Sequence, residues 1–123
     1  MNPCINALTA IAFLTSAGIA CAAGDAAHGK AIYESLCTAC HSLDYNGVGP
    51  AHRGVFGRKA GSAAAYSYSD AVKSSAIVWT DQTLGQWLAN PEKLIPGQKM
   101  GFSVPNAQDR ADVIAYLKKE SGK

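Results

Sequence analysis

Two cysteines and a histidine stand close together in the stretch Cys37-Thr38-Ala39-Cys40-His41. The thiols are three residues apart and the imidazole follows at once, so on one helical turn all three side chains share a face. Two thiols so placed can form thioether bonds to the two vinyl groups of one porphyrin, and the imidazole can then ligate its iron. The motif therefore predicts one haem c, covalently bound through Cys37 and Cys40, with His41 as an axial ligand.

Three other roles are open to this cysteine pair. A structural disulfide fits the spacing in an oxidising compartment. A thioredoxin-like redox pair needs a β-α-β context, and no strand-rich pattern surrounds the motif. A zinc site needs further ligands, and the sequence has no second C-x-x-C and no H-x-x-x-H. The rest of the sequence favours haem attachment over all three.

An electron-carrying haem iron needs a second axial ligand, for which the candidates are Met100, His28 and His52. Met100 is the only methionine besides the initiator. It lies in the turn-rich segment 95–100, where a rigid loop can hold a thioether on iron. We interpret His28 as a solvated residue of the first helix and His52 as a surface-loop residue. Met100 is the predicted ligand, and His52 is kept as an alternative.

The beginning of the chain has the composition of a secretory signal. Residues 7–20 are almost wholly apolar, no charged residue precedes Asp25, and small residues follow in Ala20-Cys21-Ala22-Ala23. An apolar segment followed by an A-x-A site indicates export and cleavage, and this segment is too short to span a bilayer comfortably. We predict a cleaved signal peptide over 1–23 and a periplasmic mature domain over 24–123.

Two alternatives to cleavage are open. Residues 1–3 carry no Lys or Arg, which leaves an uncleaved membrane anchor as one alternative. The other is a lipid-modified Cys21, which Gly18 disfavours because a lipobox prefers Leu at that position.

The composition is typical of one small domain. The chain has 123 residues, of which 48% are hydrophobic and 16% charged, and its formal net charge is +2. A charge this small, without a run of Lys or Arg, gives no support to nucleic-acid binding. The 12 glycines and 5 prolines predict a modest core that needs a staple or a cofactor.

The elements that must position these residues are helices. Caps and breakers predict helices from Asp25 to about Thr38, from Ser69 or Asp70 to about Ser75, from Thr80 to Asn90, and over about 107–120. No strand-like alternation persists, and segment 47–61 has the glycines and proline of a loop. Gly29, inside the first helix, indicates close approach by another helix.

From Gly29 onward the chain resembles a class I cytochrome c of the mitochondrial or bacterial c2 type. The matching stretches keep the family's order and nearly its spacing. They are 37–41, Gly49-Pro50, 54–58, 66–71, Trp79, Asn90-Pro91, 95–100 and 111–118. The resemblance implies an all-α fold of about four to five helices wrapped around one covalent haem, with the N- and C-terminal helices crossing where Gly29 and Tyr33 meet Val113 and Tyr116.

The resemblance also implies roles for residues around the haem. The Pro50 carbonyl would accept the Nδ1 proton of His41 and so fix the imidazole. Three side chains, those of Arg58, Tyr68 and Trp79, would bind or approach the haem propionates.

Several positions depart from the family's pattern. Trp87 stands where a Tyr usually contacts the Met ligand, Gln98 replaces a usual Thr, and Val72 replaces a usual Asn. Glu92 replaces a usual Lys at the exposed haem edge, although Lys93 remains beside it. These departures put the hydrogen-bond network around the Met ligand in doubt and thin the basic docking ring.

The function that follows is that of a soluble periplasmic one-electron carrier, not an enzyme. It would be a monomer, without stable membrane insertion once the signal is cleaved. Through its own exposed haem edge it would dock transiently with a donor, such as a quinol-oxidising bc1-type complex or a dehydrogenase, and with an acceptor, such as a terminal oxidase or a reductase. Two alternatives remain: a dedicated haem subunit of a dehydrogenase, and a haem enzyme or ligand binder with an open distal site.

Overall fold

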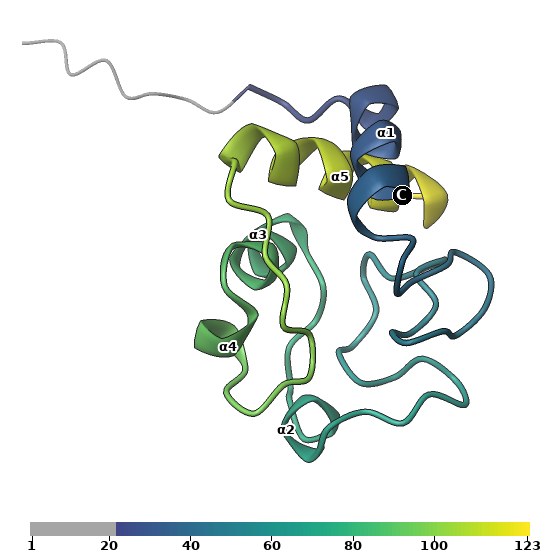
Figure 1. Ribbon diagram of the computed structural model, residues 1–123, viewed down its shortest axis with the longest axis vertical. Helices are drawn as coiled ribbons and strands as arrows, with labels where there is room; N and C mark the ends of the chain where they lie inside the picture. The colour runs from purple at the N-terminus through teal and green to yellow at the C-terminus, as the bar shows by residue number, and fades with distance from the viewer. Residues whose placement is uncertain (1–21) are drawn as a thin grey trace, which may run out of the picture.

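The computed structural model describes residues 22–123, which form five helices (Figure 1). The helices are α1 (Ala26–Leu36), α2 (Asp70–Lys73), α3 (Asp81–Ala89), α4 (Pro91–Leu94) and α5 (Ala107–Glu120). Within these residues the structure has no strand, only an isolated antiparallel bridge between Lys59 and Val78. The all-α prediction is therefore confirmed. The predicted signal peptide lies, except for Ala22 and Ala23, outside the described residues.

Local capping explains where the two long helices begin. The Asp25 side chain accepts hydrogen bonds from the backbone N–H groups of Ala27 and His28 and so starts α1. The side chain of Asn106 accepts from Asp109 N and starts α5. The predicted bounds of α5 agree with the structure, whereas α1 ends at Leu36 and not at Thr38. The residues after Leu36 form the turn that carries the cysteines.

The sequence prediction missed α4. Pro91 was expected only to end the preceding helix, but it occupies the first turn of a new one. Asn90 caps both helices: its N–H bonds to Gln86 O at the end of α3, and its side chain accepts from Lys93 N at the start of α4. Proline fits the first turn of a helix because its missing N–H would have no partner there.

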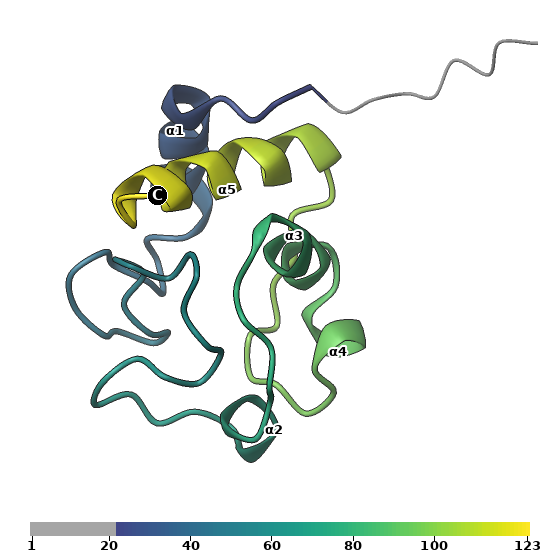
Figure 2. The ribbon, with the colours of Figure 1, turned by 180° about the vertical axis from the view of Figure 1, so that it is seen from behind.

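The first and last helices cross at one end of the molecule (Figures 1 and 2). A Cβ atom built on Gly29 would lie 1.9 Å from the backbone oxygen of Asp112, so only glycine allows this approach. Next to it, the rings of Tyr33 and Tyr116 lie 5.3 Å apart. Both rings are buried, as is Val113. The predicted crossing is confirmed.

The remaining elements lie below this crossing in two groups (Figure 1). In Figure 1 the loops between α1 and α2 lie on one side, and α3, α4 and the segment that leads to α5 lie on the other. The core includes Trp79, Leu84 and Ile95, which are all buried. None of the helices in 22–123 has the length and apolar character needed to cross a bilayer.

Candidate functional site

The cysteine turn directly follows α1. The N–H of Cys37 donates to Tyr33 O, and the N–H groups of Cys40 and His41 both donate to Cys37 O, at 3.1 and 2.9 Å. This tight turn gathers the residues of the motif at the end of the helix that crosses α5. Both thiols are free, and burial raises the pKa of Cys37 to about 11.

The His41 imidazole is held on one edge by backbone. Its Nδ1 lies 2.8 Å from the carbonyl oxygen of Pro50. Because a carbonyl only accepts, Nδ1 carries the proton and Nε2 keeps its lone pair. Burial also lowers the pKa of His41, which favours the neutral imidazole that ligates metals. This is the hydrogen bond that the resemblance implies.

Gly49 and His52 both lie closer to this imidazole than the sequence indicated. A Cβ atom on Gly49 would lie 2.2 Å from Cε1 of His41, so the backbone there approaches the ring as only glycine can. The His52 ring stacks on His41, with ring centroids 3.9 Å apart and an interplanar angle of 20°.

His52 is therefore not a surface-loop residue, and that interpretation was wrong. It is half-buried, and its Nδ1 lies 3.0 Å from the hydroxyl of Tyr33. Burial, aided by His41 and Arg58, lowers its pKa to about 3, so the ring is neutral. Stacked face to face with His41, it lies beside that ring and not across a porphyrin from it. The structure thus disfavours His52 as the second axial ligand.

His28, the other histidine considered as a ligand, belongs to the helix crossing. Its side chain is 57% exposed, as expected, but its Nδ1 lies 2.6 Å from Oδ2 of the buried Asp112. Asp109 lies close to both residues. The hydrogen bond to Asp112 raises the pKa of His28. His28 thus ties α1 to α5.

The predicted propionate partners have different surroundings. Tyr68 OH accepts a hydrogen bond from Ala63 N and keeps its own proton to donate. Trp79 is buried, and its ring centroid lies 5.3 Å from that of Trp87. Arg58 donates from Nη2 to Ala51 O at 3.0 Å, but its Nε is buried without a partner in the protein.

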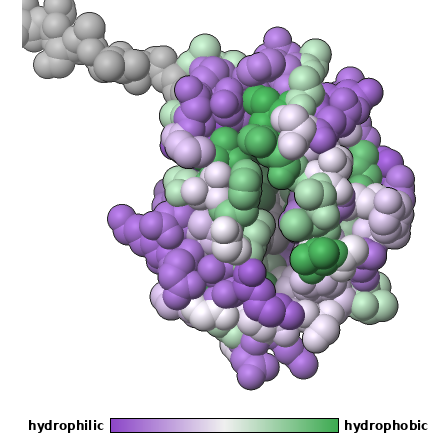
Figure 3. All heavy atoms as spheres, in the orientation of Figure 1, coloured by the Kyte–Doolittle hydropathy of each residue, from purple (hydrophilic) through white to green (hydrophobic). Residues whose placement is uncertain are grey.

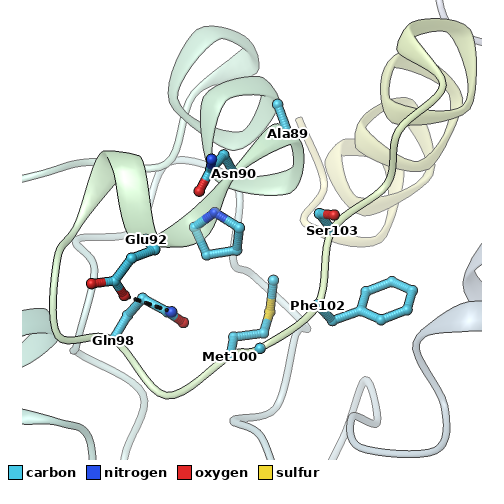
Figure 4. Close-up of a pocket in the computed structure, with 9 residues that line it drawn as sticks. Ala89, Asn90, Glu92, Gln98, Met100, Phe102 and Ser103 are labelled. Carbon is cyan, nitrogen blue, oxygen red and sulfur yellow. Dashed lines mark hydrogen bonds between the residues drawn. The ribbon is translucent and has the colours of Figure 1, made fainter.

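Met100 lies on the long segment between α4 and α5. It is half-buried, and its side chain points from the loop into a cavity of about 270 Å³ whose lining includes Asn90, Pro91 and Ser103 (Figure 4). The segment is fixed at its far end by Val104, whose N–H donates to Leu88 O at 2.7 Å. Met100 is thus presented by a loop and not by a helix.

The space between these residues suits a large flat group. Figure 3 shows a hollow running into the face seen in Figure 1, with apolar side chains on its borders. Arg58 Nε is a buried donor without a partner in the protein and needs an acceptor, which a carboxylate could supply. Free thiols, a neutral imidazole with Nε2 available and this arginine are together the donor set that a covalent haem with propionates requires. The residues fit the group.

The sequence prediction missed two functional contacts. One is the His52 stack on His41. The other contact lies just before Met100 in the chain. There the two oxygens of the Glu92 carboxylate accept hydrogen bonds from Gly97 N and Gln98 Nε2. The only sequence signals were the nearness of His52 to Gly49-Pro50 and the departures already noted at Glu92 and Gln98.

Comparison with known proteins gives a consistent result. The family model for cytochrome c matches residues 26–121. The cytochrome c of Gibberella zeae is 46% identical over 101 residues, covering 79% of this chain and 95% of its own. That of Euglena viridis is 47% identical over 98 residues, covering 77% and 96%.

Among solved structures, cytochrome cH from Methylobacterium extorquens is similar in fold and sequence. Its TM-score is 0.75 at 47% identity, and the match covers 78% of this chain and 99% of that one. The chain therefore belongs to the cytochrome c family, as a class I monohaem electron-transfer protein that binds haem c covalently through cysteine.

Proposed function

We propose that this protein is a periplasmic one-electron carrier in which Cys37 and Cys40 bind the haem and His41 and Met100 ligate its iron. The observation that carries the proposal is the enclosure of His41. Its Nδ1 proton is committed to Pro50 O at 2.8 Å, and Gly49 and the His52 ring restrict its faces. Only Nε2 remains to bind a metal.

When bound, the haem supplies an iron that cycles between the ferrous and ferric states. The residues of the chain would keep the surroundings of the iron the same in both states. His41 is kept neutral and oriented, and Met100 offers a thioether from the opposite, loop side of the hollow. Paired His and Met ligands raise the reduction potential. If His41 and Met100 both ligate the iron, no position would be left for a substrate, which supports a carrier and not an enzyme.

Arg58, Tyr68 and Trp79 are proposed to hold the propionates. Arg58 Nε is buried and unpaired in the protein, which supports an anionic partner at that point. Trp87 packs against Trp79 and is proposed to border the haem on the Met100 side. Hydrogen bonds from Arg58, Tyr68 and Trp79 would offset the cost of burying the two propionate carboxylates.

The partners are proposed to be redox proteins that dock transiently at the haem edge: a bc1-type complex or a dehydrogenase as donor, and an oxidase or a reductase as acceptor. The exposed Lys93 and Lys99 supply positive charge there, and Glu92 reduces it. A monomer and export by a signal peptide over 1–23 belong to the same proposal, supported by the apolar segment 7–20.

The test uses holoprotein purified from the periplasmic fraction, whose mass also reports whether 1–23 has been removed. Wild type is expected to show the weak near-infrared thioether–iron band. Met100→Ala is expected to lose that band and to bind carbon monoxide when ferrous. Phe102→Ala, a control on the same loop at a residue that is 45% exposed, is expected to keep the band.

The rival functions predict other results. A wild type that lacks the near-infrared band and binds carbon monoxide readily has an open distal site, and the carrier proposal then fails. Co-purification with one dehydrogenase at fixed stoichiometry indicates a dedicated subunit.

A further inference from the structure

The exposed carboxylate of Glu92 holds the turn that precedes Met100. Its Oε1 accepts a hydrogen bond from Gly97 N at 3.1 Å. Its Oε2 accepts one from Gln98 Nε2, also at 3.1 Å (Figure 4). Glu92 lies on α4, whereas Gly97 and Gln98 belong to the loop. One side chain therefore connects the short helix to the Met100 segment.

The carboxylate also determines which way the Gln98 amide faces. An ionised carboxylate only accepts hydrogen bonds, so the amide must turn its NH2 group towards Glu92. The carbonyl oxygen then points away from Glu92, on the Met100 side of the amide in Figure 4. That Oε1 is buried and has no hydrogen-bond partner in the protein. Gln98 and Met100 line the same cavity.

We propose that Glu92 is a positioning residue that, through Gln98, presents a buried carbonyl oxygen towards Met100 and thereby favours the ferric over the ferrous state. The inference rests on the proposed function, in which Met100 ligates the iron. Burial strengthens the effect of a dipole, because the surroundings screen it less than water does. The negative end of the amide dipole stabilises a centre that gains positive charge on oxidation, so it lowers the reduction potential.

The residue type at 92 decides the outcome. A lysine there can only donate, so it would pair with the Gln98 carbonyl and turn the NH2 group inward. A glutamine can accept through its own carbonyl and so permits the present orientation. Glu92→Gln and Glu92→Lys therefore separate the direction of the amide from the mere loss of the carboxylate.

The experiment measures the reduction potential of the full holoprotein in a double-mutant cycle. Glu92→Lys is made in the wild-type and the Gln98→Leu backgrounds, and Glu92→Gln is made in the same two as a matched control. The surface-charge effect of Glu92→Lys is common to both backgrounds, so their difference isolates the amide. We expect Glu92→Lys to raise the potential more when Gln98 is present, and Glu92→Gln to shift it equally in both.

Equal shifts for Glu92→Lys in the two backgrounds would overturn the proposal, as would a larger shift in the Gln98→Leu background. A second measurement needs no variant: nuclear Overhauser contacts of the Gln98 NH2 protons in the ferrous wild type. Contacts to Glu92 and Gly97 support the proposed orientation, and contacts to Met100 overturn it. If wild type lacks the near-infrared band, the proposed function fails instead, which distinguishes the two failures.

Discussion

The crossing of α1 and α5 and the loop that carries Met100 are held in different ways. At the crossing, backbone meets backbone: Gly29 faces the carbonyl of Asp112 without room for a Cβ atom. The Asp112 side chain is 4% exposed and accepts hydrogen bonds from Asp25 N, His28 Nδ1 and Gln108 Nε2, at 2.8, 2.6 and 2.9 Å. Nothing at this contact can move without the neighbouring helix.

The Met100 loop contacts the domain mainly through flexible side chains. Lys99 Nζ donates to Ser67 O at 2.6 Å and lies 5.6 Å from the centre of the Tyr66 ring. Glu92 holds the turn before it, and Phe102 is 45% exposed. Such a segment can open locally at a lower free energy than the packed core.

The two proposed axial ligands, His41 and Met100, therefore belong to parts of the molecule that are held in different ways. His41 is linked to the crossing through a chain of contacts. Its ring stacks on His52, and His52 bonds to the hydroxyl of Tyr33. The Tyr33 ring in turn packs against Tyr116 on α5. Within residues 22–123, no hydrogen bond or ring contact joins Met100 to the crossing. We expect changes at the crossing to alter global stability, and changes on the loop to alter Met100 and the reduction potential while the fold persists.

The largest effect is expected from Gly29→Ala. The new Cβ atom would meet Asp112 O at 1.9 Å, and because that atom is backbone, α5 must shift. Overpacking of this kind should lower the free energy of unfolding by about 3 kcal/mol. Denaturant unfolding of the ferrous holoprotein measures it.

Gly85→Ala is the matched control for that substitution. Gly85 also lies inside a helix, α3, but a Cβ atom there meets nothing within 4 Å. The change should raise stability by about 0.5 kcal/mol, because alanine restricts the unfolded chain and suits a helix better. If both variants lost the same stability, close packing would not be what distinguishes the crossing.

A structural feature could be predicted from the sequence where the residues that form it lie close together in the chain. The caps Asp25 and Asn106 act within one helical turn, so helix starts were predictable. The Gly29 approach was inferred because a mid-helix glycine costs stability unless another helix needs the space. The His52 stack depends on a loop returning to the cysteine turn, and Tyr33 is far from it in sequence, so no local pattern carries it.

The second effect concerns Asp112→Asn. Hydrogen bonds, first from His28 and then from Asp25 N and Gln108, hold the pKa of Asp112 below its usual 3.8. Asparagine accepts less strongly, and its NH2 group cannot accept the hydrogen bonds that one of the two carboxylate oxygens accepts from these donors. Unfolding at pH 5 to 6 should show a loss of about 2 kcal/mol, within the range for hydrogen bonds to a buried charged group.

The pH dependence of this loss follows from both partners. A depressed Asp112 pKa contributes stability above 3.8 that disappears as the pH falls through the lower folded value. The pKa of His28 is raised above 6.5, so its contribution is present below 6.5 and disappears as the pH rises through the raised value. The cost of Asp112→Asn should therefore be greatest between about pH 4 and 6.5. A cost that did not change with pH would show that the pair does not act through charge.

The smallest effect on stability is expected from Lys99→Gln, on the loop side of the comparison. The lysine is exposed, so the free energy of unfolding should change by at most about 0.5 kcal/mol. Its contact with Ser67 O nevertheless joins the Met100 segment to the opposite loop. Amide hydrogen exchange in 96–103 should accelerate while exchange in α5 stays unchanged.

Lys118→Gln removes the same charge from an exposed ion pair with Asp81 on α3 and should leave exchange in 96–103 unaltered. If both variants accelerated the loop equally, net charge and not the Ser67 contact would control its opening.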